Sequence, residues 1–125
     1  MHDNRPINLD LTTLKFPVMA ITSILHRISG ILLFLLFPLM IYFFEMSLRN
    51  AGTFAQLHAW LETCLLCKLV VWGFGVAILY HLLAGLRHIV MDLGYGETVE
   101  AGQKTSALIL ALTIGLSLLL GIWLW

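Results

Sequence analysis

Long apolar stretches alternate along this chain with shorter segments that mix charged and polar residues. Three of the stretches contain no Lys, Arg, Asp or Glu, namely 28–44, 69–86 and 105–125. A transmembrane helix needs about 20 mostly apolar residues, a length that the first two stretches reach once neutral flanking positions are added. The pattern therefore predicts an all-α membrane protein with three transmembrane helices.

We predict spans at roughly 21–46, 65–91 and 105–125, so that residues 1–125 form a single transmembrane domain. The mixed segment between the first two spans predicts a short helix at the membrane surface around 54–60. On the third span, small residues recur at four-residue spacing, which is typical of close contact between membrane helices. These small residues are Ala107, Ala111 and Gly115.

Composition supports the membrane interpretation. Of the 125 residues, 60% are hydrophobic and 11% are charged, with a mean hydropathy of +0.94. A soluble domain carries about 25% charged residues, so this class is excluded. Because the formal net charge is +0, we do not expect nucleic acid to be a partner.

Basic residues are distributed unequally between the two ends of the predicted helices. The N-terminal segment and the second connection carry Arg5, Lys15, Arg27, Arg87 and Lys104, whereas the first connection carries Arg49 and Lys68. Basic residues concentrate on the cytoplasmic side of a membrane. We therefore expect the N terminus on the cytoplasmic (or mitochondrial matrix) side and the C terminus on the other side.

His81 is the most informative residue, because it lies inside a charge-free stretch. A polar side chain at membrane depth is costly without a partner and usually marks a functional site. Small residues recur every four positions around it, at Gly73, Ala77 and Gly85, and form one stripe on a helix. Such a stripe admits either another helix or a flat porphyrin.

The predicted topology brings two separate polar clusters together. If the first helix crosses the membrane and the second returns, the start of the first lies beside the end of the second. Six residues then meet at one membrane face, namely Ser23, His26, Arg27, His81, Arg87 and His88. Packing alone does not account for so many polar residues at the end of a helix bundle.

The spacing of His81 and His88 limits what they can bind together. Seven residues on a helix place them about 20° apart in rotation and roughly 10.5 Å apart along the axis, too far for one metal ion. One could bind haem iron while the other reaches a propionate, and Gly85 would leave room for the macrocycle. Spacing alone also leaves open a structural or proton-relay histidine and a nonhaem metal. A six-coordinate haem would need its second ligand from another subunit.

Ser23 and Arg27 are four residues apart and therefore neighbours on one helix face. Arg27 could donate hydrogen bonds to a quinone carbonyl or a haem propionate, and Ser23 could bond a carbonyl oxygen. The alternative is that Arg27 is a basic anchor at the membrane edge and Ser23 a packing residue. The same alternative has more weight for Arg87, which points away from the His81 face.

Cys64 and Cys67 form a C-x-x-C sequence near the outer end of the second span. This sequence can indicate redox or metal chemistry, but no second cysteine pair and no βαβ pattern accompany it. We interpret the two residues as small apolar side chains on a membrane helix.

Two sequence patterns resemble a known family. The first is Arg5-Pro6 followed by SILHRISG at 23–30, and the second is His81 with GLRH at 85–88 and MDLG at 91–94. Both resemble the cytochrome b556 membrane-anchor subunits of succinate dehydrogenase, respiratory complex II. The resemblance covers essentially the whole chain and implies a three-helix anchor domain that packs with a second anchor subunit around haem b.

The resemblance implies roles for individual residues. His81 matches the axial ligand of the haem b iron, and the second anchor subunit supplies the opposite ligand. Ser23 and Arg27 match positions that line the ubiquinone pocket. His26 and His88, together with Arg27, match positions near the haem propionates. The resemblance implies no role for Cys64 or Cys67.

The resemblance also implies partners and a location. A flavoprotein, an iron–sulfur protein, a second small anchor subunit and membrane lipid would surround this chain, which catalyses nothing alone. We expect the bacterial inner membrane rather than the mitochondrial one. The alternatives are a fumarate reductase anchor, whose chemistry runs in reverse, and a haem-free structural membrane anchor. Sequence does not set the direction, because the redox potentials depend on the partners.

Overall fold

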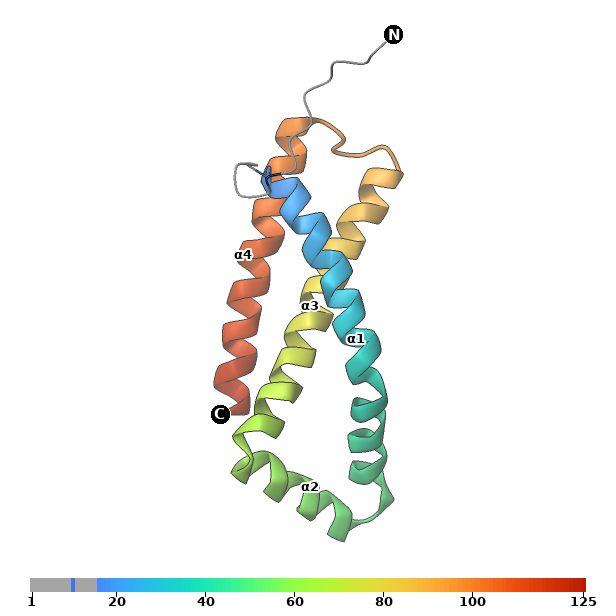
Figure 1. Ribbon diagram of the computed structural model, residues 1–125, viewed down its shortest axis with the longest axis vertical. Helices are drawn as coiled ribbons and strands as arrows, with labels where there is room; N and C mark the ends of the chain where they lie inside the picture. Colours follow the sequence, from blue (N-terminus) through green and yellow to red (C-terminus); the bar gives the residue numbers. More distant parts are fainter. Residues whose placement is uncertain (1–9, 11–15) are drawn as a thin grey trace.

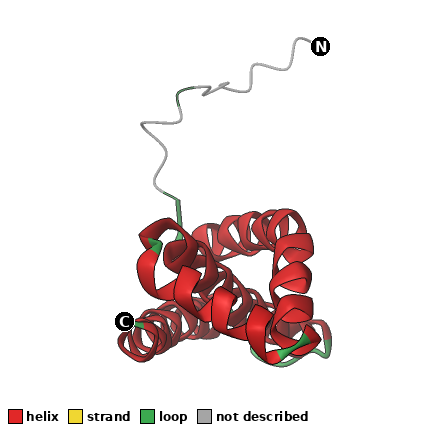
Figure 2. Cartoon of the chain, turned by 90° about the horizontal axis from the view of Figure 1, so that it is seen from below, coloured by secondary structure: helices red, strands yellow, loops and turns green. Residues whose placement is uncertain are grey.

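The computed structural model describes residue 10 and residues 16–125 of the chain. Four helices form this part, and they are α1 (Val18–Arg49), α2 (Ala51–Thr63), α3 (Leu65–Asp92) and α4 (Val99–Leu124). Short loops join the helices, and the described part contains no strand (Figure 2). The all-α prediction is confirmed, whereas Arg5, Pro6 and Lys15 lie outside the described residues.

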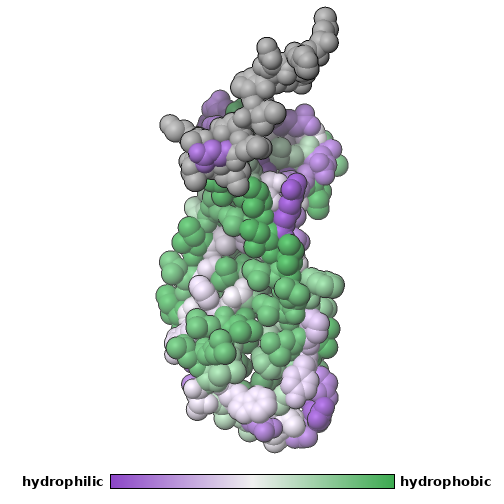
Figure 3. All heavy atoms as spheres, viewed as in Figure 1, coloured by the Kyte–Doolittle hydropathy of each residue, from purple (hydrophilic) through white to green (hydrophobic). Residues whose placement is uncertain are grey.

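Helices α1, α3 and α4 are each long and apolar enough to cross a membrane, with 32, 28 and 26 residues. At 1.5 Å per residue the shortest is about 39 Å long, more than the roughly 30 Å of a bilayer core. Tilt accommodates such excess length, and α1 and α3 cross one another at an angle (Figure 1). The surface is hydrophobic along the middle of the molecule and hydrophilic at both ends (Figure 3). Three transmembrane helices are confirmed.

Helix α2 connects the ends of α1 and α3 and lies across them (Figure 1). Asn50 starts it with a capping box, in which its side-chain oxygen accepts the Thr53 backbone N–H at 2.9 Å. In return the Thr53 hydroxyl accepts the Asn50 backbone N–H at 3.3 Å. The predicted short helix around 54–60 is thereby confirmed, with longer bounds.

The three long helices alternate in direction. The start of α1, the end of α3 and the start of α4 lie at one end of the molecule, and the C terminus lies towards the other (Figure 1). Side-chain hydrogen bonds between helices hold this arrangement. The Tyr80 hydroxyl donates to the Thr22 carbonyl of α1 at 2.7 Å, and the Trp72 indole donates to the Ser117 carbonyl of α4 at 2.9 Å. Such bonds stabilise membrane helix pairs, in which lipid removes the hydrophobic driving force.

The predicted small-residue face of α4 does not pack against the other helices of this chain, so its contact with a helix of another subunit stays a prediction. Ala107, Ala111 and Gly115 are exposed, and a Cβ atom at Gly115 would meet nothing within 4 Å. The buried face of α4 instead carries Gly102, Ser106, Ile109, Thr113 and Ser117. The physical reason is that small hydroxyl residues allow close helix approach as well as Ala and Gly do, and burial removes their polar groups from lipid.

Candidate functional site

Three histidines from α1 and α3 meet where these helices cross. The rings of His26 and His81 stack, with centroids 4.2 Å apart and planes inclined by 18°. The ring of His88 lies 5.1 Å from that of His26. The topology predicted from the sequence is thus confirmed for this cluster, because the start of α1 lies beside the end of α3.

Hydrogen bonds from α1 orient the His81 ring. Its Nδ1 lies 3.0 Å from the Ser29 hydroxyl oxygen and 3.2 Å from the His26 carbonyl oxygen. Ser29 donates its own proton to that carbonyl at 2.7 Å, so both oxygens act as acceptors towards Nδ1. The ring proton therefore belongs on Nδ1, and the lone pair on Nε2 is available to a ligand.

Two glycines lie against this cluster, and one of them makes room for it. A Cβ atom at Gly30 would lie 3.2 Å from Cε1 of His81, which is tighter than ordinary side-chain contacts. A Cβ atom at Gly85 would lie 3.5 Å from Nε2 of His26, at ordinary contact distance. Gly30 thus allows α1 to approach His81 closely, while the His26 ring packs over Gly85.

His81 also faces outward into an apolar groove. This groove measures about 230 Å³ and is lined by His81, Leu82, Gly85, Leu86 and Ile89. A second groove of about 540 Å³ lies between α1 and α3, with Phe74 and Ile78 as its α3 members. Because these α3 residues recur every three to four positions, both grooves share one face of the helix.

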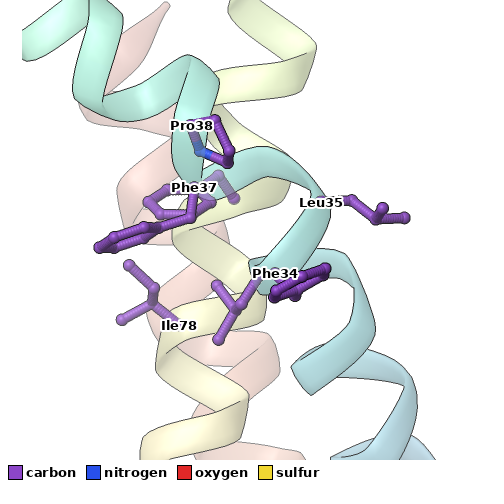
Figure 4. A pocket seen from close by; sticks show the side chains of 7 residues that line it. Phe34, Leu35, Phe37, Pro38 and Ile78 are labelled. Atoms are coloured by element: carbon purple, nitrogen blue, oxygen red, sulfur yellow. The ribbon is translucent and has the colours of Figure 1, made fainter.

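Figure 4 shows the second groove from close by. Phe37 and Ile78 lie on the same side of the helix pair, whereas Leu35 points to the other side. Pro38 lies in the wall of the groove, inside α1. Neither groove carries a charged side chain, so this face suits an apolar or flat ligand or a partner helix.

Ser23 and Arg27 lie on α1 but outside the histidine cluster. Arg27 is exposed and Ser23 is half-buried, and neither forms a hydrogen bond to another side chain in the described part of the chain. Ser23 and Arg27 are one turn apart on a face next to that of His26. Arg27 is therefore free to bind a group outside this chain.

Arg87 behaves differently from the other five predicted polar residues. Its side chain is buried, with 8% exposed, and it contacts α4 rather than the histidines. Its Nε donates to the Thr105 hydroxyl at 3.0 Å, and its Nη2 donates to the Gly102 carbonyl at 3.3 Å. The prediction that Arg87 points away from the His81 face is confirmed. Arg87 is buried against α4, however, and is not a solvated basic anchor at the membrane edge.

Comparison with known proteins decides the family. Residues 1–120 match the model of the succinate dehydrogenase/fumarate reductase transmembrane subunit. The chain belongs to this family. A succinate dehydrogenase cytochrome b556 subunit from Coxiella burnetii is 44% identical over 125 residues, covering all of both chains.

Two more distant relatives agree. The subunit of the same name from Paracoccus denitrificans is 35% identical over 93% of this chain and 88% of its own. A succinate dehydrogenase cytochrome b560 subunit from Reclinomonas americana is 32% identical over 90% of this chain and 81% of its own. The family resemblance inferred from the two sequence patterns is thereby confirmed.

For this succinate dehydrogenase family member, the structure adds residues that the sequence alone did not single out. Ser29 and Gly30 stand inside the first pattern, and Tyr80 precedes His81, but their roles depend on which way each helix face turns. Cys64 takes a structural role, because its sulfur accepts the Cys67 backbone N–H at 3.2 Å at the start of α3. Hydrogen bonding to Cys67 lowers the pKa of the Cys64 thiol.

Proposed function

We propose that this chain is the cytochrome b membrane anchor of a succinate dehydrogenase, in which His81 would hold the iron of haem b. The observation that carries this proposal is the His81 ring, whose Nδ1 is held by α1 and whose Nε2 is left for a ligand beside an apolar groove. A metal-ligating histidine typically has its other nitrogen bonded in this way. Bound haem would supply a one-electron redox centre within the membrane.

His26 and His88 would take supporting roles in this site. Nε2 of His26 is buried without a hydrogen-bond partner in the described part of the chain, next to Gly85. His88 lies nearer the helix end and would reach a propionate, with Arg27 as a second donor. In the described residues no group of three or more His, Cys, Asp or Glu is placed to hold a metal ion. The second haem ligand would come from a second small anchor subunit, as the family resemblance implies.

Ser23 and Arg27 would form this chain's part of a ubiquinone-reduction site. The exposed Arg27 guanidinium would donate hydrogen bonds to a quinone carbonyl and stabilise negative charge that develops on it. Ser23, one turn earlier on the same face, would bond a carbonyl oxygen. Electrons would arrive from an iron–sulfur subunit. That subunit would receive them from a flavoprotein subunit, which oxidises succinate. The names of the relatives favour this direction over fumarate reduction.

Orientation follows from the basic residues. Arg27, Arg87 and Lys104 stand at the end of the molecule where α1 starts, whereas Arg49 and Lys68 stand at the other. The positive-inside rule supports an N terminus in the cytoplasm of a bacterium, with the protein in the inner membrane. The catalytic subunits would then bind at the end that carries Arg27.

A visible spectrum of the purified complex tests the haem proposal. The chain is tagged, extracted with its native partners and measured as a dithionite-reduced minus oxidised spectrum. We expect a b-type haem signal that disappears in His81→Ala while flavin and iron–sulfur signals remain. His58→Ala is the matched control, because His58 is exposed on α2 at the far end of the molecule. A haem signal that survives in His81→Ala would exclude His81 as ligand.

A further inference from the structure

Arg87 carries a buried positive charge whose hydrogen bonds within the helices go to uncharged groups. Both hydrogen-bond acceptors of its guanidinium, the Thr105 hydroxyl and the Gly102 carbonyl, are uncharged. On α4, Glu100 pairs with Lys104 at 2.7 Å rather than with Arg87. Uncharged acceptors offset only part of the cost of burying a charge, so an anion that reaches Arg87 would be stabilised there.

A groove of about 410 Å³ opens beside Arg87, between α3, α4 and the loop that joins them. Apart from Arg87, its walls are mainly aliphatic, with Leu83, Leu86 and Leu108 as members. Leu86 and Leu108 are each 57% exposed, so the groove is open towards the surroundings of the helices. This groove combines one positive charge with a long apolar wall.

The position of Arg87 indicates what kind of anion would fit. Arg87 precedes the end of α3 at Asp92 by five residues, which places it about 7.5 Å inside the helix end. This depth corresponds to the boundary between lipid headgroups and acyl chains. A guanidinium matches the oxygens of a phosphate, with which it forms charge-assisted hydrogen bonds. An anionic head at the boundary and an apolar tail in the groove are the two features of a phospholipid.

We propose that the groove beside Arg87 is a phospholipid-binding site, in which the guanidinium binds the headgroup phosphate and an acyl chain lies along Leu83, Leu86 and Leu108. The site is separate from the histidine cluster, because Arg87 faces α4 and His81 faces α1. It therefore stands whether or not His81 binds haem.

Native mass spectrometry of the intact, delipidated complex tests this site, with phosphatidylglycerol and inorganic phosphate as separate probes. We expect one phosphatidylglycerol to bind the wild-type complex per copy of this chain, and to bind Arg87→Gln roughly tenfold or more weakly. Arg87→Lys keeps the charge and should fall between the two. Lys104→Gln is the control for general surface charge and should bind as the wild type does.

A second pair of variants tests the groove without changing its charge. These variants still test the lipid site if the Arg87→Gln complex fails to assemble. Leu108→Trp fills the groove and should weaken phosphatidylglycerol binding. Leu112→Trp, one turn further along α4 and outside this groove, should not. Haem and flavin signals of each variant show separately whether the complex and its redox site are intact.

Three results would overturn the proposal. Unchanged phosphatidylglycerol binding in Arg87→Gln would mean that Arg87 does not bind the headgroup. Inorganic phosphate that binds at Arg87 as tightly as the lipid would indicate a soluble anion. An equal loss in Lys104→Gln would indicate unspecific attraction to surface charge.

Discussion

Nδ1 of His81 lies 3.0 Å from the hydroxyl oxygen of Ser29, a residue on the neighbouring helix. The contact joins α3 to α1 at the depth where the histidine rings stack, and a bond from Ser29 to the His26 carbonyl fixes the hydroxyl itself. The orientation of His81 is thus set by α1, a different helix from its own. Substitutions on α1 should therefore be detectable at His81.

Removing the Ser29 hydroxyl should weaken the haem site without emptying it. Loss of a residue that orients a metal ligand typically costs tenfold or more in affinity, so we expect Ser29→Ala to retain haem roughly tenfold less tightly and to shift its midpoint potential. Haem retention during dilution and a redox titration of the purified complex measure both effects.

Ser47→Ala is the matched control for Ser29→Ala. Ser47 donates the same kind of bond to a carbonyl three residues earlier, Phe44, at 2.6 Å, but lies at the other end of α1, far from the histidines. Replacing Ser47 should leave the midpoint potential of the haem and the haem content of the complex unchanged. Identical behaviour of the two variants would mean that Ser29 does not orient His81.

A methyl group at Gly30 should disturb His81 directly. The added Cβ would lie 3.2 Å from Cε1 of His81, so the ring or the helix must move by a few tenths of an ångström. We expect Gly30→Ala to change the electron paramagnetic resonance spectrum of the haem and to cancel the gain of about 1 kcal/mol that Ala normally has over Gly in a helix. Gly115→Ala, whose Cβ would meet nothing within 4 Å, should do neither.

Sequence predicted those features that depend on helix length and order. Charge-free stretches define the spans, and alternation of direction brings His26 to His81, because neither depends on how each helix is rotated. Features that depend on how each helix is rotated about its own axis were not predictable in the same way. The burial of Arg87 and the Tyr80 bond to α1 were missed, because many residues on an apolar helix could equally face a neighbour.

The Tyr80 hydroxyl should contribute measurably to the packing of α1 against α3. It is buried, with 6% of the residue exposed, and donates to the Thr22 carbonyl at 2.7 Å. Tyr80→Phe keeps the ring and removes this bond, so we expect a loss of about 0.6–1.5 kcal/mol in the free energy of unfolding.

Thermal denaturation of the complex, followed by loss of the haem signal, measures the effect of Tyr80→Phe. Tyr42→Phe serves as control, because Tyr42 is on α1 and 50% exposed. Equal midpoints for the two variants would show that the Tyr80 bond contributes nothing net to stability. A lower midpoint for Tyr80→Phe alone is the expected result.

Arg27→Ala should separate quinone reduction from succinate oxidation. The Arg27 side chain is exposed and bonds no described side chain, so its loss removes a group available to quinone while leaving the packing of α1 intact. Hydrogen bonds from a charged donor are worth about 1.5–3 kcal/mol, which predicts a roughly tenfold or larger fall in kcat/KM for ubiquinone. Reduction of an artificial dye by the catalytic subunits should stay near the wild-type rate.

Arg49→Ala is the control for Arg27→Ala. It removes an exposed arginine that pairs with Glu45 at the opposite end of α1, and it should leave both rates unchanged. If Arg27→Ala lowers both rates together, the arginine serves assembly of the complex, and its proposed place in the quinone site is wrong.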